Sequence, residues 1–236
     1  LNEGKPKPKG VVEFQLKQAE IIYSELSKET KDFFDMMVNE ELMDLENRAG
    51  KSGGGFCTSF PSLERPYIFA NFNGTDHDVT VLTHEAGHAF QCYQSRNQPI
   101  NRYLWPTYEA CEIHSMSMEF LTWDWMHLFF KEDTDKFLFK HLAGSLAFLP
   151  YGALVDHFQH WVYENPNATP KERKLQWLEL EKIYQPGKNY DDLDFLKNGG
   201  FWKKQAHIYE MPFYYIDYTL AQICAFQFWI RMQEDK

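Results

Sequence analysis

The sequence predicts a mainly α-helical domain with one small β-hairpin or sheet near its start. Two short runs of β-forming residues, at 55–60 and 66–72, are bounded by glycine and proline. The chain before these runs and the whole chain after them carry apolar residues at helical spacing. No stretch has the composition of a long linker, so residues 1–236 are expected to form a single domain.

The first part of the chain is predicted to form two amphipathic helices, over residues 11–26 and 29–48. Leu16, Ala19 and Tyr23 repeat at helical spacing in the first of them. In the second, phenylalanine, methionine and leucine do the same, with acids between them. A glycine-rich run then ends the helical pattern.

Two short strands are predicted next, over Gly55–Phe60 and Pro66–Phe72, separated by Pro61 and charged turn residues. The second strand directly precedes a long helix, so it is expected to lie at the rim of whatever site that helix carries. Such a strand, if it forms the edge of the sheet, can pair with an extended peptide. A purely structural hairpin is the equal alternative.

The rest of the chain is predicted to be helical. Capping residues at 73–76 begin a helix that runs to about Ser95, and Pro106 suits the first turn of the next one. Breaks at Asn165-Pro166, Pro186-Gly187 and Gly199-Gly200 separate the others. The predicted helices that follow the one ending near Ser95 span 106–130, 134–164, 170–184, 201–209 and 212–234.

Composition narrows the classes of partner. The net charge of −10 argues against nucleic acid and anionic membranes, which both bind basic patches. No apolar run reaches the 18 or so residues of a membrane span. The four cysteines are far apart, which favours reduced thiols and a cytoplasmic protein. We therefore expect neither a nucleic-acid partner nor a membrane partner.

The most informative segment is His84-Glu85-Ala86-Gly87-His88, an HExxH pattern. Residues four apart on a helix lie one turn apart on the same face, so both imidazoles can reach one ion while Glu85 holds a water. The apolar residues of this segment repeat on the opposite face. Two solvated histidines on a surface helix are the alternative.

A catalytic zinc site needs a third ligand and one open position. The predicted helix over 106–130 offers Glu109, Glu112 and Glu119, of which Glu112 and Glu119 share a face with Ser115. Carboxylates on a half-apolar helix need a partner, and a metal ion is a suitable one. Spacing alone leaves the three acids in competition, with Glu112 preferred.

These motifs resemble the thimet oligopeptidase and oligoendopeptidase F family of zinc peptidases, and oligoendopeptidase F most. The resemblance covers the chain from about residue 30 onward and is most specific where the HEAGH block and a later histidine-to-tyrosine block occur together. The matching segments are SGGGFCTSF (52–60), FANFNGT (69–75), DVTVLTHEAGHAFQ (78–91), EIHSMSME (112–119), VDHFQHWVYENP (155–166) and HIYEMPFYYIDYTLA (207–221).

The resemblance implies one Zn²⁺ ion held by His84, His88 and Glu112, with Glu85 as general base. It implies that Glu119 supports these ligands from behind. His207, Tyr215 and Tyr218 are implied to line the substrate site, with a tyrosine serving the oxyanion. Tyr214 competes with Tyr215 for the first tyrosine position because the two are adjacent.

The implied function is that of a zinc-dependent metalloendopeptidase that hydrolyses short, unstructured peptides. Family members are usually more than twice as long, so this chain is expected to be the catalytic C-terminal half. The N-terminal half that is missing here would form the opposite wall of a deep channel, and activity is expected to require it.

Two other functions compete with this one. A zinc carboxypeptidase on a similar scaffold would need a cation that binds the terminal carboxylate of a substrate, and Arg96, Arg102 and Arg173 are the candidates. A non-catalytic fragment that binds zinc or peptide is the third possibility. Cleavage of a peptide blocked at both ends separates the endopeptidase from the carboxypeptidase, and zinc content without turnover identifies the fragment.

Overall fold

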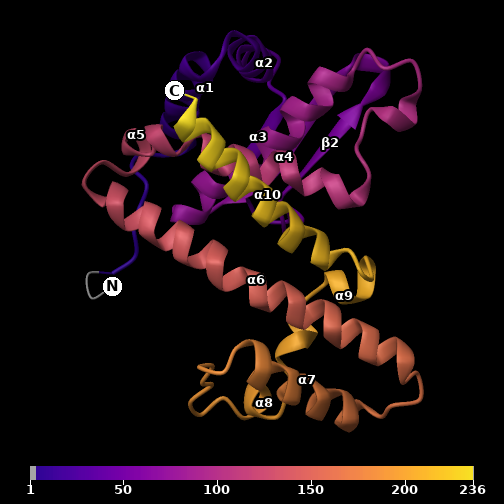
Figure 1. Cartoon of the computed structure of the whole chain (residues 1–236). Coiled ribbons are helices and arrows are strands. Elements are labelled where there is room, and N and C mark those ends of the chain that lie inside the picture. The colour runs from indigo at the N-terminus through magenta and orange to yellow at the C-terminus, as the bar shows by residue number, and fades with distance from the viewer. Residues whose placement is uncertain (1–3, 236) are drawn as a thin grey trace. The chain divides into compact units, whose positions relative to one another are not determined.

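The computed structural model describes residues 4–235, and the chain forms two compact units within it. Unit 1 runs up to Leu142 and takes in the chain from Ile223 onward, and unit 2 is Ala143–Gln222. Both are mainly helical, and the sheet seen in the described residues lies in unit 1 (Figure 1). The predicted fold class is therefore confirmed.

Unit 1 begins with two helices that pack against each other, α1 (Val12–Leu26) and α2 (Lys28–Asn39). The side chain of Ser27 caps the start of α2 and shares a capping box with Thr30. The first helix agrees with its prediction. The second ends at Asn39, well before the predicted end at residue 48, so that prediction was wrong at its C-terminus.

A strand that was not predicted follows α2. This strand, β1 (Met43–Glu46), begins after Glu41, whose φ of 54° lies in the left-handed region and turns the chain out of the helix. It runs parallel to a later strand, with Met43 opposite Ile68. A strand of four residues gives too little local signal for prediction. Its acidic and apolar residues also fit the pattern of the amphipathic helix predicted there.

The predicted hairpin is present as β2 (Phe56–Phe60) and β3 (Arg65–Phe72), which pair antiparallel. The strand order is β1-β3-β2, so β3 is the central strand. The expectation that Pro66–Phe72 forms an edge was therefore wrong, because β1 occupies its other side. Within the described chain, the two edge strands of this sheet are β1 and β2.

The glycine-rich loop between β1 and β2 is tied to the sheet by two side chains. Lys51, whose side chain is only 1% exposed, donates from Nζ to the carbonyl oxygens of Asp44, Glu46 and Ala70 and forms an ion pair with Asp44. Asn71 Nδ2 donates to the carbonyl oxygens of Ser52 and Gly54. The loop therefore has a defined conformation although it is rich in glycine.

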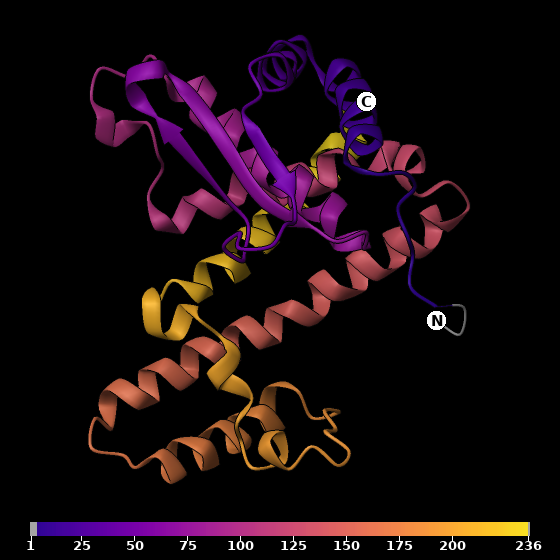
Figure 2. The ribbon, with the colours of Figure 1, turned by 180° about the vertical axis from the view of Figure 1, so that it is seen from behind.

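One face of the sheet is covered by α3 (Asp76–Ser95), with α4 (Tyr108–Leu121) packed against α3 (Figures 1 and 2). The first agrees with its prediction. The predicted helix over 106–130 is instead divided into α4, a 3₁₀ turn at Trp123–Trp125 and α5 (His127–Phe130). Thr107 is the N-cap of α4, so Pro106 lies before the helix and not in its first turn.

The core of unit 1 fixes the orientation of α3. Val79, Leu82 and Ala86 are completely buried, as their spacing predicts, and they pack with Phe33 and Ile68 from α2 and β3. Burying one such side chain contributes about 1.5–3 kcal/mol. Since this face of α3 is committed to the core, the opposite face is free to present polar side chains.

Helices of unit 2 follow the predicted order. The helix α6 (Thr134–Glu164) begins in unit 1, and α10 (Tyr215–Glu234) ends there. The helix α6 and the helix that follows it over 170–184 have the predicted bounds. The predicted helix over 201–209 is instead divided into a 3₁₀ turn and a short helix. Unit 2 contains α6 in part, α7 (Pro170–Tyr184), α8 (Asp194–Lys197), the turn Phe201–Lys204, α9 (His207–Glu210) and the start of α10.

The core of unit 2 is aromatic. Phe158 of α6 meets Trp177 of α7 edge to face at 5.2 Å, and both are completely buried. Local signals fix α7 well, because Pro170 lies in its first turn and Thr169 forms a capping box with Glu172. The start of α10 lies later than the predicted residue 212.

One helical stretch among the described residues, His127–Glu164, is long and apolar enough to cross a membrane, with a mean hydropathy of 1.3 over 18 residues. The expectation that no such run exists was therefore wrong. Length and composition alone are weak evidence of a span, since helices of soluble proteins pass the same test. The absence of a membrane partner stays a prediction.

Candidate metal centre

The helix α3 presents His84 and His88 one turn apart on the same face. Asp78 stabilises the start of this helix by accepting hydrogen bonds from the backbone N–H groups of Asn73 and Gly74. The two imidazole rings lie 5.0 Å apart between centroids, with their planes at 80°. Both can therefore direct a nitrogen toward the same point.

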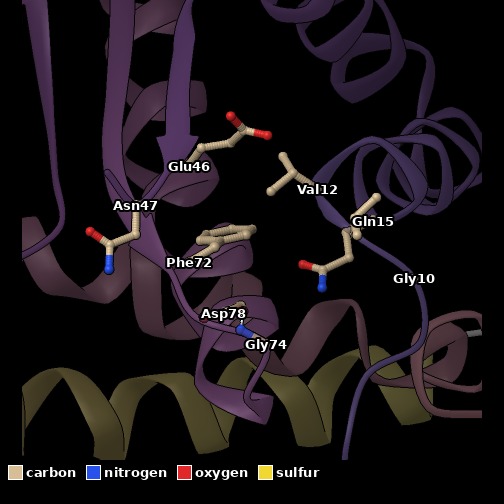
Figure 3. A pocket seen from close by; sticks show the side chains of 9 residues that line it. Gly10, Val12, Gln15, Glu46, Asn47, Phe72, Gly74 and Asp78 are labelled. Carbon is tan, nitrogen blue, oxygen red and sulfur yellow. Dashed lines mark hydrogen bonds between the residues drawn. The ribbon is translucent and has the colours of Figure 1, made fainter. Parts of the chain in front are cut away.

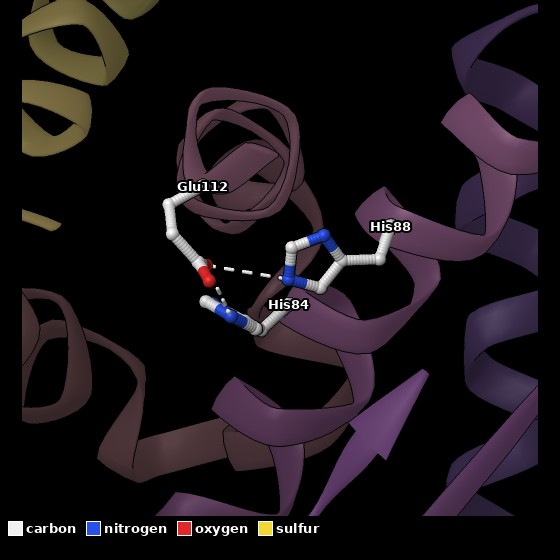
Figure 4. A group of neighbouring side chains, drawn as sticks. All are labelled: His84, His88 and Glu112. Carbon is white, nitrogen blue, oxygen red and sulfur yellow. Dashed lines mark ion pairs between the residues drawn. The ribbon is translucent and has the colours of Figure 1, made fainter. Parts of the chain in front are cut away.

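A carboxylate from α4 reaches that point (Figure 4). Oε2 of Glu112 lies 3.2 Å from Nε2 of His84 and 3.3 Å from Nε2 of His88. The ligand atoms that the three residues offer all lie within 4.8 Å of one another. Two imidazole nitrogens and one carboxylate oxygen so arranged are the donor set of a catalytic zinc site with one open position.

The close approach of α3 and α4 depends on Gly87, between the two histidines. A Cβ atom at Gly87 would lie 2.7 Å from the carbonyl oxygen of His114 and from Cα of Ser115. Glycine is the one residue that leaves this space to the neighbouring backbone. The crossing point lies one turn from Glu112, so it sets how far this carboxylate reaches toward the histidines.

The three acids of α4 lie in different environments. Glu109 is exposed at the start of the helix, where its own backbone N–H and Thr107 lower its pKa. Glu112 is buried in the cluster, and Glu119 is buried behind His84. The structure thus brings together the three residues that the family resemblance implies as ligands.

Glu112 is held as an anion. Burial by itself would raise its pKa, but the imidazoles of His84 and His88 lower it, so that the pKa lies far below its ordinary value. Ser115 donates a hydrogen bond from Oγ to Oε2 of Glu112 at 2.9 Å. This hydroxyl, one turn along α4, orients the carboxylate.

Glu119, predicted to support the ligands, lies behind His84. Its Oε1 lies 2.7 Å from Nδ1 of His84. Burial would raise the pKa of Glu119, yet His141 and His84 lower it to about 2. The pKa of His84 is raised well above its usual value: burial acts to lower it, but Glu112 and Glu119 outweigh burial.

The predicted general base, Glu85, lies beside the cluster. It is 7% exposed, and burial raises its pKa, opposed by the nearby His84 and His88. Its Oε2 is buried and has no hydrogen-bond partner in the described chain, and a Cβ atom at Gly55 would lie 3.8 Å from its Oε1. A carboxylate in this environment is suited to accept a proton near neutral pH.

The other predicted site residues gather in unit 2. The phenol oxygen of Tyr218 lies 3.3 Å from Nε2 of His207, and the ring of Tyr215 lies edge-on to His207 at 5.2 Å. Tyr215 is 9% exposed and belongs to the aromatic core, where burial raises its pKa to about 12. Tyr214 stacks at 6.5 Å from His207, so both candidates for the first tyrosine stay beside the histidine.

Gln205 is a site neighbour that sequence analysis missed. Its Nε2 lies 2.8 Å from Nδ1 of His207, and its Oε1 accepts a hydrogen bond from Tyr151 at 2.9 Å. With the amide donating to Nδ1, the neutral ring of His207 carries its proton on Nε2, toward Tyr218. No spacing in the sequence links Tyr151 to this group.

Two further residues near the metal cluster were also missed. Nε2 of His141 lies 2.7 Å from Oε2 of Glu119, and Trp123 donates from Nε1 to Nδ1 of His141 at 3.0 Å. His141 comes from α6, 22 residues after Glu119 in the sequence. Helical periodicity gives no signal over such a separation.

A separate pocket of about 370 Å³ lies at the N-terminal end of α3 (Figure 3). Its lining includes Gln15 of α1, Phe72 of β3 and Asp78 of α3. None of the predicted site residues lines it. Asp78 accepts hydrogen bonds from the backbone N–H groups of Asn73 and Gly74, so this part of the lining holds the turn before α3.

A helix that carries HExxH and meets a carboxylate from the next helix is the arrangement found in metallopeptidases. Comparison with known proteins agrees with this class. The chain belongs to peptidase family M3, whose profile matches residues 15–236. The family that the motifs resemble is thus confirmed.

Solved structures of relatives match closely. The chain is 60% identical to a putative oligoendopeptidase F, with a TM-score of 0.95, and 59% identical to PZ peptidase A crystallised with an inhibitor, with a TM-score of 0.96. Each match covers 98% of this chain and 41% of the relative. An oligoendopeptidase F homolog of Borreliella burgdorferi is 25% identical over 94% of this chain and 37% of its own length. The chain thus spans about two fifths of these relatives.

Proposed function

We propose that this chain is the catalytic part of a zinc-dependent endopeptidase that cleaves internal bonds of short, unstructured peptides. The observation that carries the proposal is the convergence of His84, His88 and Glu112 beside the buried, unpartnered oxygen of Glu85. The names of the relatives, oligoendopeptidase F and PZ peptidase A, support the choice of substrate.

Zinc fits the residues present. The donor set is two imidazole nitrogens and one carboxylate oxygen, and Glu119 gives His84 the buried carboxylate partner that zinc-binding histidines usually have. When bound, zinc would supply Lewis acidity, lowering the pKa of water toward about 7 and polarising a peptide carbonyl.

Glu85 performs the proton transfers in this proposal. Its Oε2 takes a proton from the attacking water and then gives it to the nitrogen of the leaving amine, which completes the hydrolysis. Burial favours this role, because it raises the pKa of Glu85 and so keeps a protonated form accessible. The base thus needs no other residue to return the proton.

The substrate would lie along the free edge of β2. An extended peptide added there would pair with backbone groups of Phe56–Phe60, beside Gly55 and hence beside Glu85. We further propose that Tyr218 donates a hydrogen bond from its phenol to the carbonyl oxygen as that oxygen gains negative charge, with His207 as its hydrogen-bonded neighbour.

A further N-terminal portion, matching the part of the relatives that this chain does not cover, would form the rest of the substrate channel. Because the chain spans about 41% of the solved relatives, we propose that turnover needs the N-terminal half. The test is cleavage of an internally quenched peptide blocked at both ends. The full-length protein should cleave it and the Glu85→Gln variant should not. Cleavage only of peptides with a free terminus would contradict an endopeptidase.

The carboxypeptidase alternative is not favoured by any cation near the cluster in the described chain. Arg96 is engaged by Tyr93, over whose ring its guanidinium lies at 3.7 Å, and Arg173 donates to the carbonyl oxygen of Pro166. Arg102 lines a pocket with Trp105, and none of the three predicted ligands lines that pocket. Failure to cleave blocked peptides, together with release of C-terminal residues, would restore this alternative.

A further inference from the structure

Behind the metal cluster, four side chains of unit 1 form a continuous row of hydrogen bonds. Trp123 Nε1 lies 3.0 Å from Nδ1 of His141, and Nε2 of His141 lies 2.7 Å from Oε2 of Glu119. The other oxygen of Glu119 lies 2.7 Å from Nδ1 of His84. The row ends at Nε2 of His84, the atom that faces Glu112.

The direction of every bond in this row follows from the indole. An indole N–H can only donate, so Nδ1 of His141 must accept. The neutral ring of His141 therefore carries its proton on Nε2 and donates it to Glu119. Glu119 in turn accepts a hydrogen bond on its other side from Nδ1 of His84, so Nε2 of His84 is the nitrogen left to bind a metal ion.

Packing holds this row in place. The side chain of His141 is 9% exposed; its ring stacks on Phe137 at 5.6 Å and 13° and lies 4.9 Å from Phe120. Trp123 packs against Trp229 at 5.0 Å. Since the imidazole is enclosed by aromatic rings, water has little room to replace either of its partners.

Loss of the indole N–H would remove the constraint on His141. Its ring could then carry the proton on Nδ1 and turn a lone pair toward the carboxylate of Glu119. Two acceptors would face each other at 2.7 Å in a buried place, and one of them would have to move or take up a proton. Either change alters the hydrogen bond that orients His84.

We propose that Trp123 and His141 are positioning residues that set the orientation and tautomer of the metal ligand His84 through Glu119. The inference rests on the proposed function, in which His84 binds zinc. It assigns a role in metal affinity to an indole three hydrogen bonds removed from the ligand atom.

The first test measures the zinc dissociation constant by competition with a chromogenic chelator, using the full-length protein. Trp123→Phe and His141→Phe should bind zinc about 10–100-fold more weakly, the usual cost of removing an outer partner of a metal ligand. His141→Gln should restore affinity to near wild type, because its amide can accept from Trp123 and donate to Glu119. Wild-type affinity in a folded Trp123→Phe protein would overturn the proposal.

Trp125→Phe is the matched control. Trp125 lies in the same 3₁₀ turn and, like Trp123, donates its indole N–H to a side chain. Its acceptor is the carboxylate of Glu25 at 2.6 Å, which lies outside the row. Its zinc affinity should equal that of the wild type. An equal loss in Trp125→Phe and Trp123→Phe would mean that both act through the fold, which contradicts a positioning role.

A second readout does not depend on zinc. Long-range ¹H–¹⁵N NMR of the imidazoles should find the proton of His141 on Nε2, and Trp123→Phe should redistribute it between the two nitrogens. A proton on Nδ1 in the wild type would overturn the proposal even if zinc binds. Conversely, absence of zinc binding by the wild type with the expected His141 tautomer would refute the proposed function and leave the direction of the row intact.

Discussion

The most demanding prediction concerns Gly87, which occupies the crossing of α3 and α4. In Gly87→Ala the new Cβ would lie 2.7 Å from backbone atoms of His114 and Ser115, where ordinary contacts are about 3.5–4.0 Å. The helix α4 must therefore withdraw by roughly 1 Å. Glu112 moves with it, whereas His84 and His88 stay on α3.

Gly87→Ala should have a small effect on the stability of the fold and a larger effect on zinc affinity. Overpacking costs about 1–3 kcal/mol, and alanine regains about 1 kcal/mol of helix propensity relative to glycine. The net loss of about 0–2 kcal/mol should lower Tm by no more than about 8 °C in a chain of this size. Metal sites tolerate ligand displacements of only about 0.2 Å, so zinc affinity should fall at least about tenfold.

Gly144→Ala is the control for this experiment. Gly144 also lies in a helix, α6, but a Cβ there meets nothing within 4 Å, so its Tm should stay the same or rise. Both variants are compared with the wild type by calorimetry of the metal-free protein and by chelator competition. Gly87→Ala with wild-type zinc affinity and a raised Tm would refute the claim that the close approach sets the reach of Glu112.

Five further substitutions test the roles proposed for individual side chains. His84→Ala should lose most of the zinc by elemental analysis, because two ligands hold a divalent ion poorly; near-stoichiometric zinc would exclude it as a ligand. Glu85→Gln should keep its zinc and lose nearly all turnover, since an amide cannot accept the proton of water. Glu112→Gln should weaken zinc binding whereas Glu109→Gln should not, and the reverse result would mean that the exposed acid is the ligand. Tyr218→Phe should lower kcat by about 10²–10³ with KM and zinc nearly unchanged, and an unaltered kcat would make this phenol structural.

Sequence alone predicts those features that depend on neighbours along the chain. The bounds of α7 were predicted correctly because Thr169, Pro170 and Glu172 are local start signals. The approach of His84 and His88 to one point likewise follows from four-residue spacing on one helix. In both cases the physical cause lies within a few residues.

Features that depend on distant partners were missed. The strand β1 exists because β3 supplies its hydrogen bonds from residue 68 onward, and four residues alone do not specify it. His141 became part of the site only when α6 carried it to Glu119, and Tyr151 only through its contact with Gln205. No periodicity in the sequence encodes these tertiary contacts.

The reactivity of the Lys51 amine can be used to measure opening of the glycine-rich loop. Its ammonium is enclosed by three carbonyl oxygens and the carboxylate of Asp44, so it cannot react with an amine-selective reagent while the loop lies on the sheet. Salt screens such a buried pair only weakly. The rate at which Lys51 is acylated therefore measures how often the loop beside Glu85 dissociates from the sheet.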